Sequence, residues 1–160
     1  MTSARASTLN AHFTDKSVID AMYKVLNNLG FTKGNILEPS MGIGNFFSRL
    51  PADMSASKLY GVELDPVTGR MAQLIYPDAH IDVKGYEKTD FQNDFFDVAI
   101  GNVPFGQYKV LDKAYEQTSI SIYIDYFFAK TIDKVRPGGV IAFITSKGTM
   151  DKTNPSVRSI

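Results

Sequence analysis

The chain has 160 residues, 44% of them hydrophobic, which suits one domain with its own core rather than two. Lysine plus arginine and aspartate plus glutamate number 17 each, so the chain lacks the net positive charge that drives most nucleic-acid binding. It has no cysteine and two histidines, which excludes disulfides and argues against a metal centre. Its apolar runs are too short for a membrane segment or signal peptide, so we expect a cytoplasmic protein.

Apolar residues at helical spacing predict three long helices, and a fourth, short helix is also expected. The first follows Asp15 as its N-cap and ends at Gly30. A short helix is expected at 45–50, and a second long one follows Asp65 as its N-cap, with proline at its first position. The third occupies 120–135 and ends at an Arg-Pro-Gly-Gly sequence. The apolar residues that predict the first two long helices are Val18, Ile19, Met22, Val25, Leu26 and Leu29, and then Met71, Leu74 and Ile75.

Five short β-like runs alternate with these helical patterns, at 35–39, 58–64, 80–84, 95–101 and 139–145. Strands that alternate with helices form a parallel sheet, so the sequence predicts an α/β domain with a doubly wound, mainly parallel sheet. The fifth strand would leave an apolar edge open, which is unusual. We therefore expect residues 1–160 to be a fragment of a longer polypeptide. This fragment would form a single domain that lacks the last strands of the sheet. We also expect it to associate with itself through the fifth strand or to carry a disordered tail.

The loops after the first two strands carry candidate ligand-binding residues. In a parallel α/β sheet, ligands bind beyond the carboxyl ends of the strands. Gly42 and Gly44 follow the first strand and allow the backbone to approach a ligand. Glu63 ends the second strand about 20 residues after the glycines. At this position an acidic side chain can accept hydrogen bonds from the hydroxyls of a ribose. Together these residues predict a cofactor that contains adenosine.

Two cofactors fit that pattern. A dinucleotide fold would have a third glycine where this chain has the bulky Phe47. The acidic Glu38 suits a ligand with an ammonium and a sulfonium better than one with phosphates. This favours S-adenosylmethionine over NAD. In the competing interpretation Gly42 and Gly44 only make a tight turn and Asp65 is only a helix cap, and for Asp65 we prefer the cap.

Two further groups follow the third and fourth strands. Asp90 could accept a hydrogen bond from the amino group of the cofactor's adenine, and Phe91 could pack against the adenine ring. An isolated aspartate at this position is more often a loop or capping residue. The fourth strand runs into a tetrapeptide, which is the strongest signal in the chain. Its residues are Asn102, Val103, Pro104 and Phe105. The alternative for this tetrapeptide is a turn that closes the strand, with Phe105 packed inward.

The tetrapeptide resembles the Asn/Asp-Pro-Pro-Tyr/Phe motif of the amino-methyltransferases, and the loop at 37–46 resembles that of N6-adenine DNA methyltransferases in particular. The resemblance covers about residues 12–150 and includes Phe13 and Thr14. It implies methyl transfer from S-adenosylmethionine to the N6 amino group of adenine in DNA. It assigns cofactor contacts to Thr14, Glu38, Pro39, Gly42, Gly44, Glu63, Asp90 and Phe91, and catalysis to Asn102, Val103, Pro104 and Phe105.

The sequence departs from the family motif at Val103, which replaces the first proline. The chemistry requires two acceptors that turn the target amine toward tetrahedral geometry. The side-chain oxygen of Asn102 and a main-chain carbonyl supply them, and valine has a carbonyl as proline does. Pro104 keeps Val103 extended. Phe105 would stack on the target base, worth about 1–3 kcal/mol, which offsets part of the cost of extruding the base.

Other substrates and a non-catalytic role fit parts of the same pattern. The tetrapeptide also occurs in enzymes that methylate an RNA base amine or a protein glutamine. A module that only binds cofactor or DNA is the non-enzymatic alternative, with Val103 as a sign of decay. Since no target-recognition region is identified, we expect weak DNA binding by this chain alone, with Lys109 and Lys113 as phosphate contacts.

Overall fold

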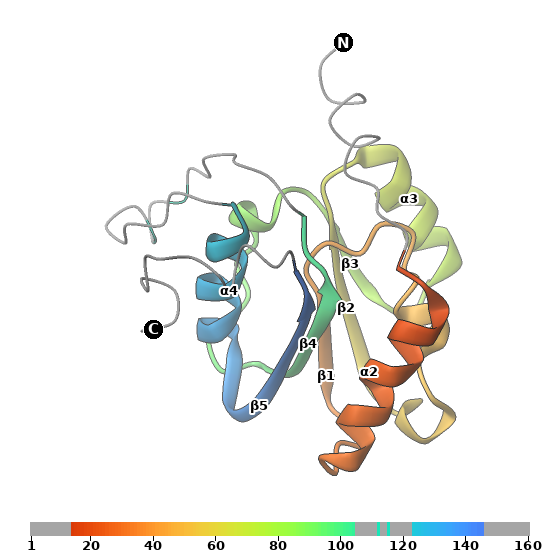
Figure 1. Cartoon of the computed structure of the whole chain (residues 1–160). Helices are drawn as coiled ribbons and strands as arrows, with labels where there is room; N and C mark the ends of the chain where they lie inside the picture. The colour runs from red at the N-terminus through yellow and green to blue at the C-terminus, as the bar shows by residue number, and fades with distance from the viewer. Residues whose placement is uncertain (1–13, 105–111, 113–114, 116–122, 146–160) are drawn as a thin grey trace.

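The computed structural model describes residues 14–104 and 123–145 and the single positions Asp112 and Tyr115. Five strands form one parallel sheet in the order β3-β2-β1-β4-β5 (Figure 1). The strands are β1 (Asn35–Glu38), β2 (Lys58–Glu63), β3 (His80–Val83), β4 (Phe96–Asn102) and β5 (Val135–Ile144). The strand order reverses between β1 and β4, which is where such sheets bind ligands. The predicted α/β class is confirmed.

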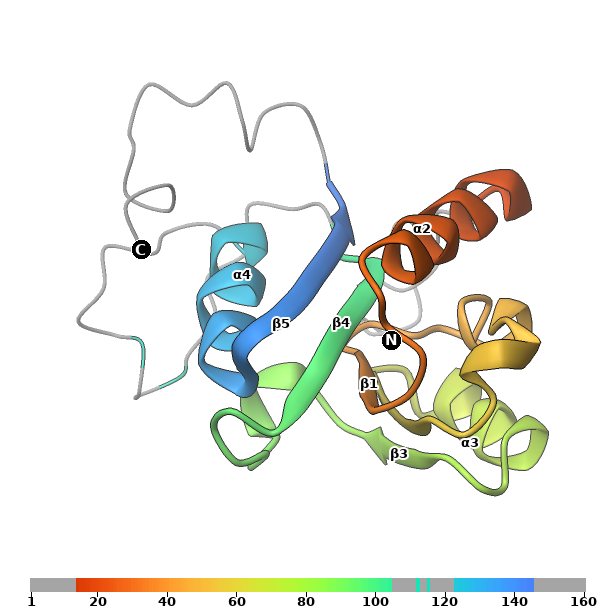
Figure 2. The same ribbon diagram turned by 90° about the horizontal axis from the view of Figure 1, so that it is seen from below.

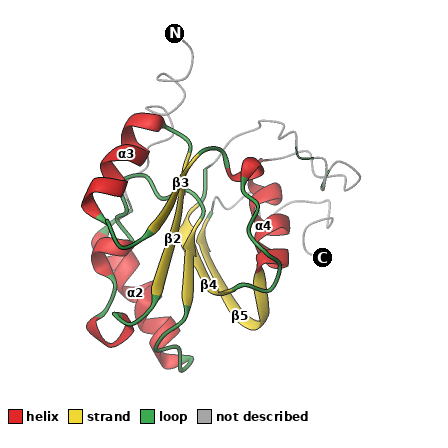
Figure 3. Ribbon diagram, turned by 180° about the vertical axis from the view of Figure 1, so that it is seen from behind, coloured by secondary structure: helices red, strands yellow, loops and turns green. Residues whose placement is uncertain are grey.

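The helices cover both faces of the sheet. Ile36 of β1 lies opposite Val98 of β4, and both pack with α2 (Lys16–Asn28) on one face. Leu37 and Ala99, the next residues of each strand, pack with α4 (Tyr123–Lys134) on the other face. Figures 2 and 3 show α4 on one side of the sheet and α2 and α3 (Pro66–Ile75) on the other. This is the doubly wound arrangement that the alternating pattern predicts.

Helix α2 begins as predicted, but it buries a different face. The Asp15 carboxylate accepts a 2.8 Å hydrogen bond from the Ser17 N–H, and Gly30 takes a positive φ of 87° after the last turn. The residues buried against the sheet are Ile19, Tyr23 and Leu26. Three members of the expected stripe, Val18, Val25 and Leu29, are exposed. The stripe is wider than the one face that a helix on a sheet can bury.

Helix α3 also turns its expected apolar residues outward. Asp65 is the N-cap, as predicted: its carboxylate accepts hydrogen bonds from the Thr68 N–H and hydroxyl, both 2.8 Å long. The helix buries Gly69 and Ala72 instead of larger residues. A methyl group on Gly69 would lie 2.8 Å from Val83 Cγ1, so the helix approaches β3 too closely for a larger side chain. The residues left exposed are Met71, Leu74 and Ile75.

The connections differ slightly from expectation. The short helix after β1 is a 3-10 turn, η1 (Phe47–Arg49), which is followed by a second one, η2 (Ala52–Met54). Strand β5 begins at Val135, four residues earlier than the pattern predicts, with an irregular register against the start of β4. Asp97 links this end of β5 to β1, because its carboxylate accepts from both Arg136 Nε (2.6 Å) and the Asn35 N–H (2.7 Å). Among the described helices, none is long and apolar enough to cross a bilayer.

Candidate functional site

Three polar side chains end the three central strands of the sheet. Glu38 is the last residue of β1, Glu63 of β2 and Asn102 of β4. Because the strands are parallel, their carboxyl ends lie at one edge. Glu38 lies beside Gly101 of β4, since a Cβ at Gly101 would be in ordinary van der Waals contact with Glu38 Cγ, at 3.5 Å. The structure thus brings together the predicted residues from strands one, two and four.

The glycine loop after β1 is tied to the end of β2. Gly42 and Gly44 have φ values of 56° and 83°, in the region that glycine adopts readily. The Glu63 carboxylate accepts hydrogen bonds from the N–H groups of Gly42 and Asp65, each 2.8 Å long. A Cβ on Gly42 would meet no described atom within 4 Å, so this side of the loop is open to a ligand.

Two tyrosines hold the carbonyl groups of the same loop. Tyr23 of α2 donates its hydroxyl to the Phe46 carbonyl at 3.0 Å, and Tyr76, just after α3, donates to the Gly44 carbonyl at 2.7 Å. Any side chain on Gly44 would overlap the Tyr76 ring. The sequence pattern does not single out either tyrosine, because an aromatic residue within or next to an amphipathic helix is indistinguishable from ordinary core packing.

Glu38 is a buried acid in an unusual setting. Its side chain is 2% exposed, and Oε2 forms no hydrogen bond with any part of the chain that the structure describes. Burial raises the pKa of Glu38 well above its usual range, and the nearby Glu63 carboxylate raises it further. A buried carboxyl without a partner is costly in its charged form. The environment therefore suits either a protonated Glu38 or a cation from a ligand.

The predicted catalytic tetrapeptide begins with Asn102, whose side-chain nitrogen is held by Thr14. Asn102 Nδ2 donates to Thr14 Oγ1 at 3.2 Å, so Thr14, predicted as a cofactor contact, meets a residue predicted to be catalytic. Val103 is fully buried, and its N–H donates to the Ile144 carbonyl at 3.4 Å. A proline at 103 could not make this bond, so the departure from the family motif has a structural use. Phe105 lies outside the described residues, as do Lys109 and Lys113.

Asp90 and Phe91 do not join the other predicted residues. The Asp90 side chain is 96% exposed and lies 3.6 Å from Lys84 Nζ. The Phe91 ring centroid is 5.1 Å from that of Phe96 and 6.4 Å from that of His80, and these residues begin β4 and β3. Phe91 therefore lies toward the amino-terminal edge of the sheet, away from Glu38.

Another acid, Glu87, follows β3 more closely in the sequence than Asp90 does. Glu87 belongs to the 3-10 turn η3 (Tyr86–Lys88), which begins three residues after the end of β3. Its side chain is half-buried and folds back over Gly85, where any added Cβ would collide with the carboxylate. Glu87 is the first acid after the third strand.

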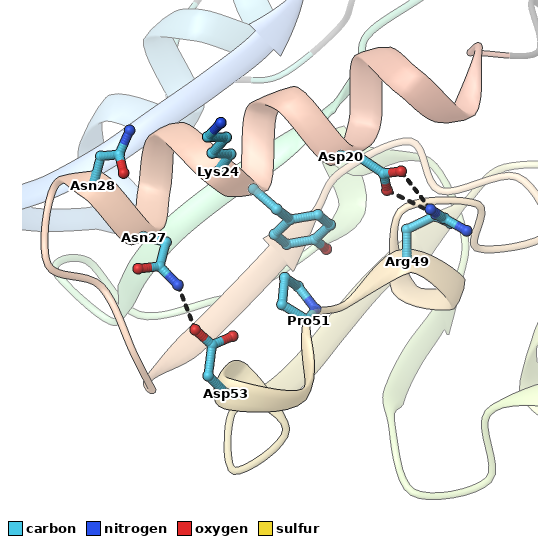
Figure 4. Close-up of a pocket in the computed structure, with 8 residues that line it drawn as sticks. Asp20, Lys24, Asn27, Asn28, Arg49, Pro51 and Asp53 are labelled. Carbon is cyan, nitrogen blue, oxygen red and sulfur yellow. Dashed lines mark hydrogen bonds and ion pairs between the residues drawn. The ribbon is translucent and has the colours of Figure 1, made fainter.

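A groove of about 580 Å³ lies between α2 and the turns η1 and η2 (Figure 4). Polar residues that line the groove bond to one another: Arg49 forms an ion pair with Asp20, and the Asn27 amide donates a hydrogen bond to the Asp53 carboxylate. Tyr23 lines its inner wall, with the hydroxyl directed to the loop carbonyl described above. These contacts attach α2 to the segment that follows the glycine loop.

Comparison with known proteins gives relatives in sequence and in structure. No family model matches the chain. It is 29% identical over 153 residues to Defense against restriction protein B of Escherichia phage P1, covering 92% of this chain and 6% of that protein. It is 33% identical over 94 residues to the Type II methyltransferase M.CvrRI of Paramecium bursaria Chlorella virus XZ-6E. That match covers 58% of this chain and 24% of the viral enzyme, so the chain spans a small part of both relatives.

Solved structures share the architecture. A SAM-dependent O-methyltransferase from Thermotoga maritima superposes with a TM-score of 0.59 at 16% identity, covering 88% of this chain and 49% of that one. A TehB-like SAM-dependent methyltransferase from Corynebacterium glutamicum gives 0.56 at 15% identity, covering 79% and 62%. Geranyl diphosphate methyltransferase, in complex with GPP and sinefungin, gives 0.59 at 14% identity, covering 87% and 50%. The chain has the fold of S-adenosylmethionine-dependent methyltransferases.

Proposed function

We propose that this chain binds S-adenosylmethionine and transfers its methyl group to an amino group, with N6 of adenine in DNA as the substrate. The observation that carries the proposal is the meeting of Glu38, the open glycine loop and Asn102 at the point where the strand order reverses. The fold supports the cofactor, and the names of the phage and viral relatives support a role connected with DNA restriction or modification.

The described residues fit the cofactor in chemical terms. Glu38 is a buried acid without a partner for Oε2, and it would face the ammonium of the methionine part. Glu63 has accepted two backbone N–H groups, but a carboxylate has about four lone-pair positions and can still accept ribose hydroxyls. Glu87 replaces Asp90 as our candidate acceptor for the adenine amino group. When bound, the cofactor supplies a methyl group on a positively charged sulfur.

Asn102 would position the target amine. Because its amide nitrogen donates to Thr14, its Oδ1 is the atom that accepts a hydrogen bond from the amine. The main-chain carbonyl of Val103 provides the second acceptor. Val103 itself is held by its buried side chain and its bond to β5, so this carbonyl is preorganised even though the family proline is missing. Phe105 would stack on the extruded base.

The first test of the proposal is titration calorimetry of the chain with S-adenosylmethionine, with NAD as competitor. We expect binding to the first ligand and no competition from NAD. A methylation assay then follows transfer of a labelled methyl group to duplex DNA, RNA and protein in separate reactions. Label in DNA that is lost in Asn102→Ala and retained in Asn28→Ala, an exposed asparagine on α2, supports the proposed substrate.

The remaining outcomes separate the alternatives. Label in RNA or in protein glutamine would move the substrate to those amines while keeping the same chemistry. Cofactor binding without transfer to any acceptor would indicate a binding module. No binding of S-adenosylmethionine would overturn the proposed function.

A further inference from the structure

We propose that Glu38 carries a proton in the ligand-free protein and releases it when the ammonium of S-adenosylmethionine binds, so that each cofactor molecule bound releases one proton. The inference rests on the proposed function, because it concerns the same cofactor. It adds a pH dependence to cofactor binding and assigns that dependence to one side chain.

The position of Glu38 in the sheet is the first argument. It ends β1, the middle strand, with β2 on one side and β4 on the other. It is 2% exposed, which leaves almost no contact with water. Within the described residues its Oε2 has no hydrogen-bond partner, and no lysine or arginine forms an ion pair with it. A charged carboxylate in this position would lack both solvent and a counterion.

The surrounding groups also oppose the charged form. From β2, Glu63 contributes a second carboxylate. Tyr23 of α2 and Tyr76 at the end of α3 lie near Glu38. Their hydroxyl groups donate to loop carbonyls and therefore do not donate to the Glu38 carboxylate. Arg49, in the turn after the loop, is paired with Asp20. From β4, Gly101 contributes only backbone.

A bound ammonium reverses this balance. An opposite charge close to a carboxyl group favours its ionised form. The step is a proton transfer to solvent: the neutral Glu38 carboxyl loses its proton, and the resulting carboxylate pairs with the ligand ammonium without a covalent change. By linkage, binding should tighten as pH rises: the dissociation constant should fall by up to tenfold for each unit of pH increase. This holds in the pH range where free Glu38 is protonated and bound Glu38 is ionised.

The experiment is titration calorimetry with S-adenosylmethionine near pH 7 in three buffers of different ionisation enthalpy. The slope of observed heat against buffer ionisation enthalpy gives the number of protons released. We expect a value near one for the wild-type chain and near zero for Glu38→Gln. Asp78→Asn, which alters an exposed acid after α3, should behave as the wild type. The wild-type slope is informative even if Glu38→Gln fails to fold.

Two ligands identify the group responsible. S-adenosylhomocysteine keeps the ammonium and lacks the sulfonium charge, so it should release the same proton. Methylthioadenosine lacks the amino-acid part and should release none. Binding of S-adenosylmethionine with no proton release would overturn this inference and leave the proposed function intact. No binding by the wild-type chain would overturn both.

Discussion

The N–H of Gly42 donates a 2.8 Å hydrogen bond to Glu63 Oε2, which joins the loop after β1 to the end of β2. The other carboxylate oxygen of Glu63 accepts from the Asp65 N–H, so one side chain fixes two loops of the site. Burial raises the pKa of Glu63, while the hydrogen bonds from Asp65 and Gly42 lower it, and the net direction is upward. Glu63 is therefore part of the scaffold before any ligand arrives.

Glu63→Ala should weaken cofactor binding and also destabilise the ligand-free chain. Two partly buried N–H groups lose their acceptor, at a cost of about 1–3 kcal/mol each. Urea unfolding measures the stability loss and calorimetry the affinity. Glu63→Gln is the matched variant, since its remaining carbonyl oxygen can keep one of the two bonds. An alanine variant as stable as the wild type would contradict the bridging role.

Thr14→Val should lower kcat more than it changes cofactor affinity. The substitution removes the acceptor for Asn102 Nδ2, so Asn102 loses one of the contacts that fix its orientation. The loss of one hydrogen bond, about 1 kcal/mol, corresponds to a roughly fivefold decrease in rate. Steady-state methylation and calorimetry separate the two effects. Thr14→Ser keeps the hydroxyl and should restore the rate; a valine variant with unchanged kcat would remove Thr14 from catalysis.

Val103→Pro restores the family motif, yet it should destabilise this chain by about 1–3 kcal/mol. The substitution removes the N–H that bonds to Ile144 and leaves the Ile144 carbonyl without this donor. Thermal and urea unfolding measure the change. Val103→Ile retains the N–H and serves as the control for altered side-chain volume. Equal stability with proline would show that this hydrogen bond contributes little.

Much of the fold could be predicted from the sequence, because its signals are local. Asp15 and Asp65 cap helices as expected, and the strand ends place Glu38 and Glu63 at one edge. The faces that α2 and α3 bury could not be predicted, because they depend on how closely each helix approaches the sheet. Asp90 illustrates the same limit, since the exposure of its side chain depends on the path of the chain after β3, which the sequence does not specify.

The exposed face of α3 provides a test of that packing. Leu74 is 84% exposed, so Leu74→Gln should change the free energy of unfolding by no more than about 0.5 kcal/mol. Ala72 lies fully buried on the opposite face, where Ala72→Leu should destabilise by about 1–3 kcal/mol through overpacking. Urea unfolding of both variants is the measurement. A large loss from Leu74→Gln would show that this face is covered.

Glu38 should also make the stability of the ligand-free chain depend on pH. Burial, followed by the charge of Glu63, raises its pKa in the folded state above the unfolded value of about 4.3. Between these two pKa values the folded chain binds one more proton than the unfolded chain. The free energy of unfolding should therefore fall as pH rises from about 4.3, by up to about 1.4 kcal/mol per pH unit, until Glu38 ionises in the folded state.

Urea unfolding of the wild type and Glu38→Gln from about pH 5 to 8 isolates this contribution, because other titrating groups are common to both chains. The difference in stability between variant and wild type should move in favour of glutamine as pH rises, since glutamine has no proton to lose. Asp78→Asn should track the wild type at every pH. A constant difference between Glu38→Gln and wild type over the whole range would mean that Glu38 is ionised in the folded chain despite its burial, and that it has a counterion or donor beyond the described residues.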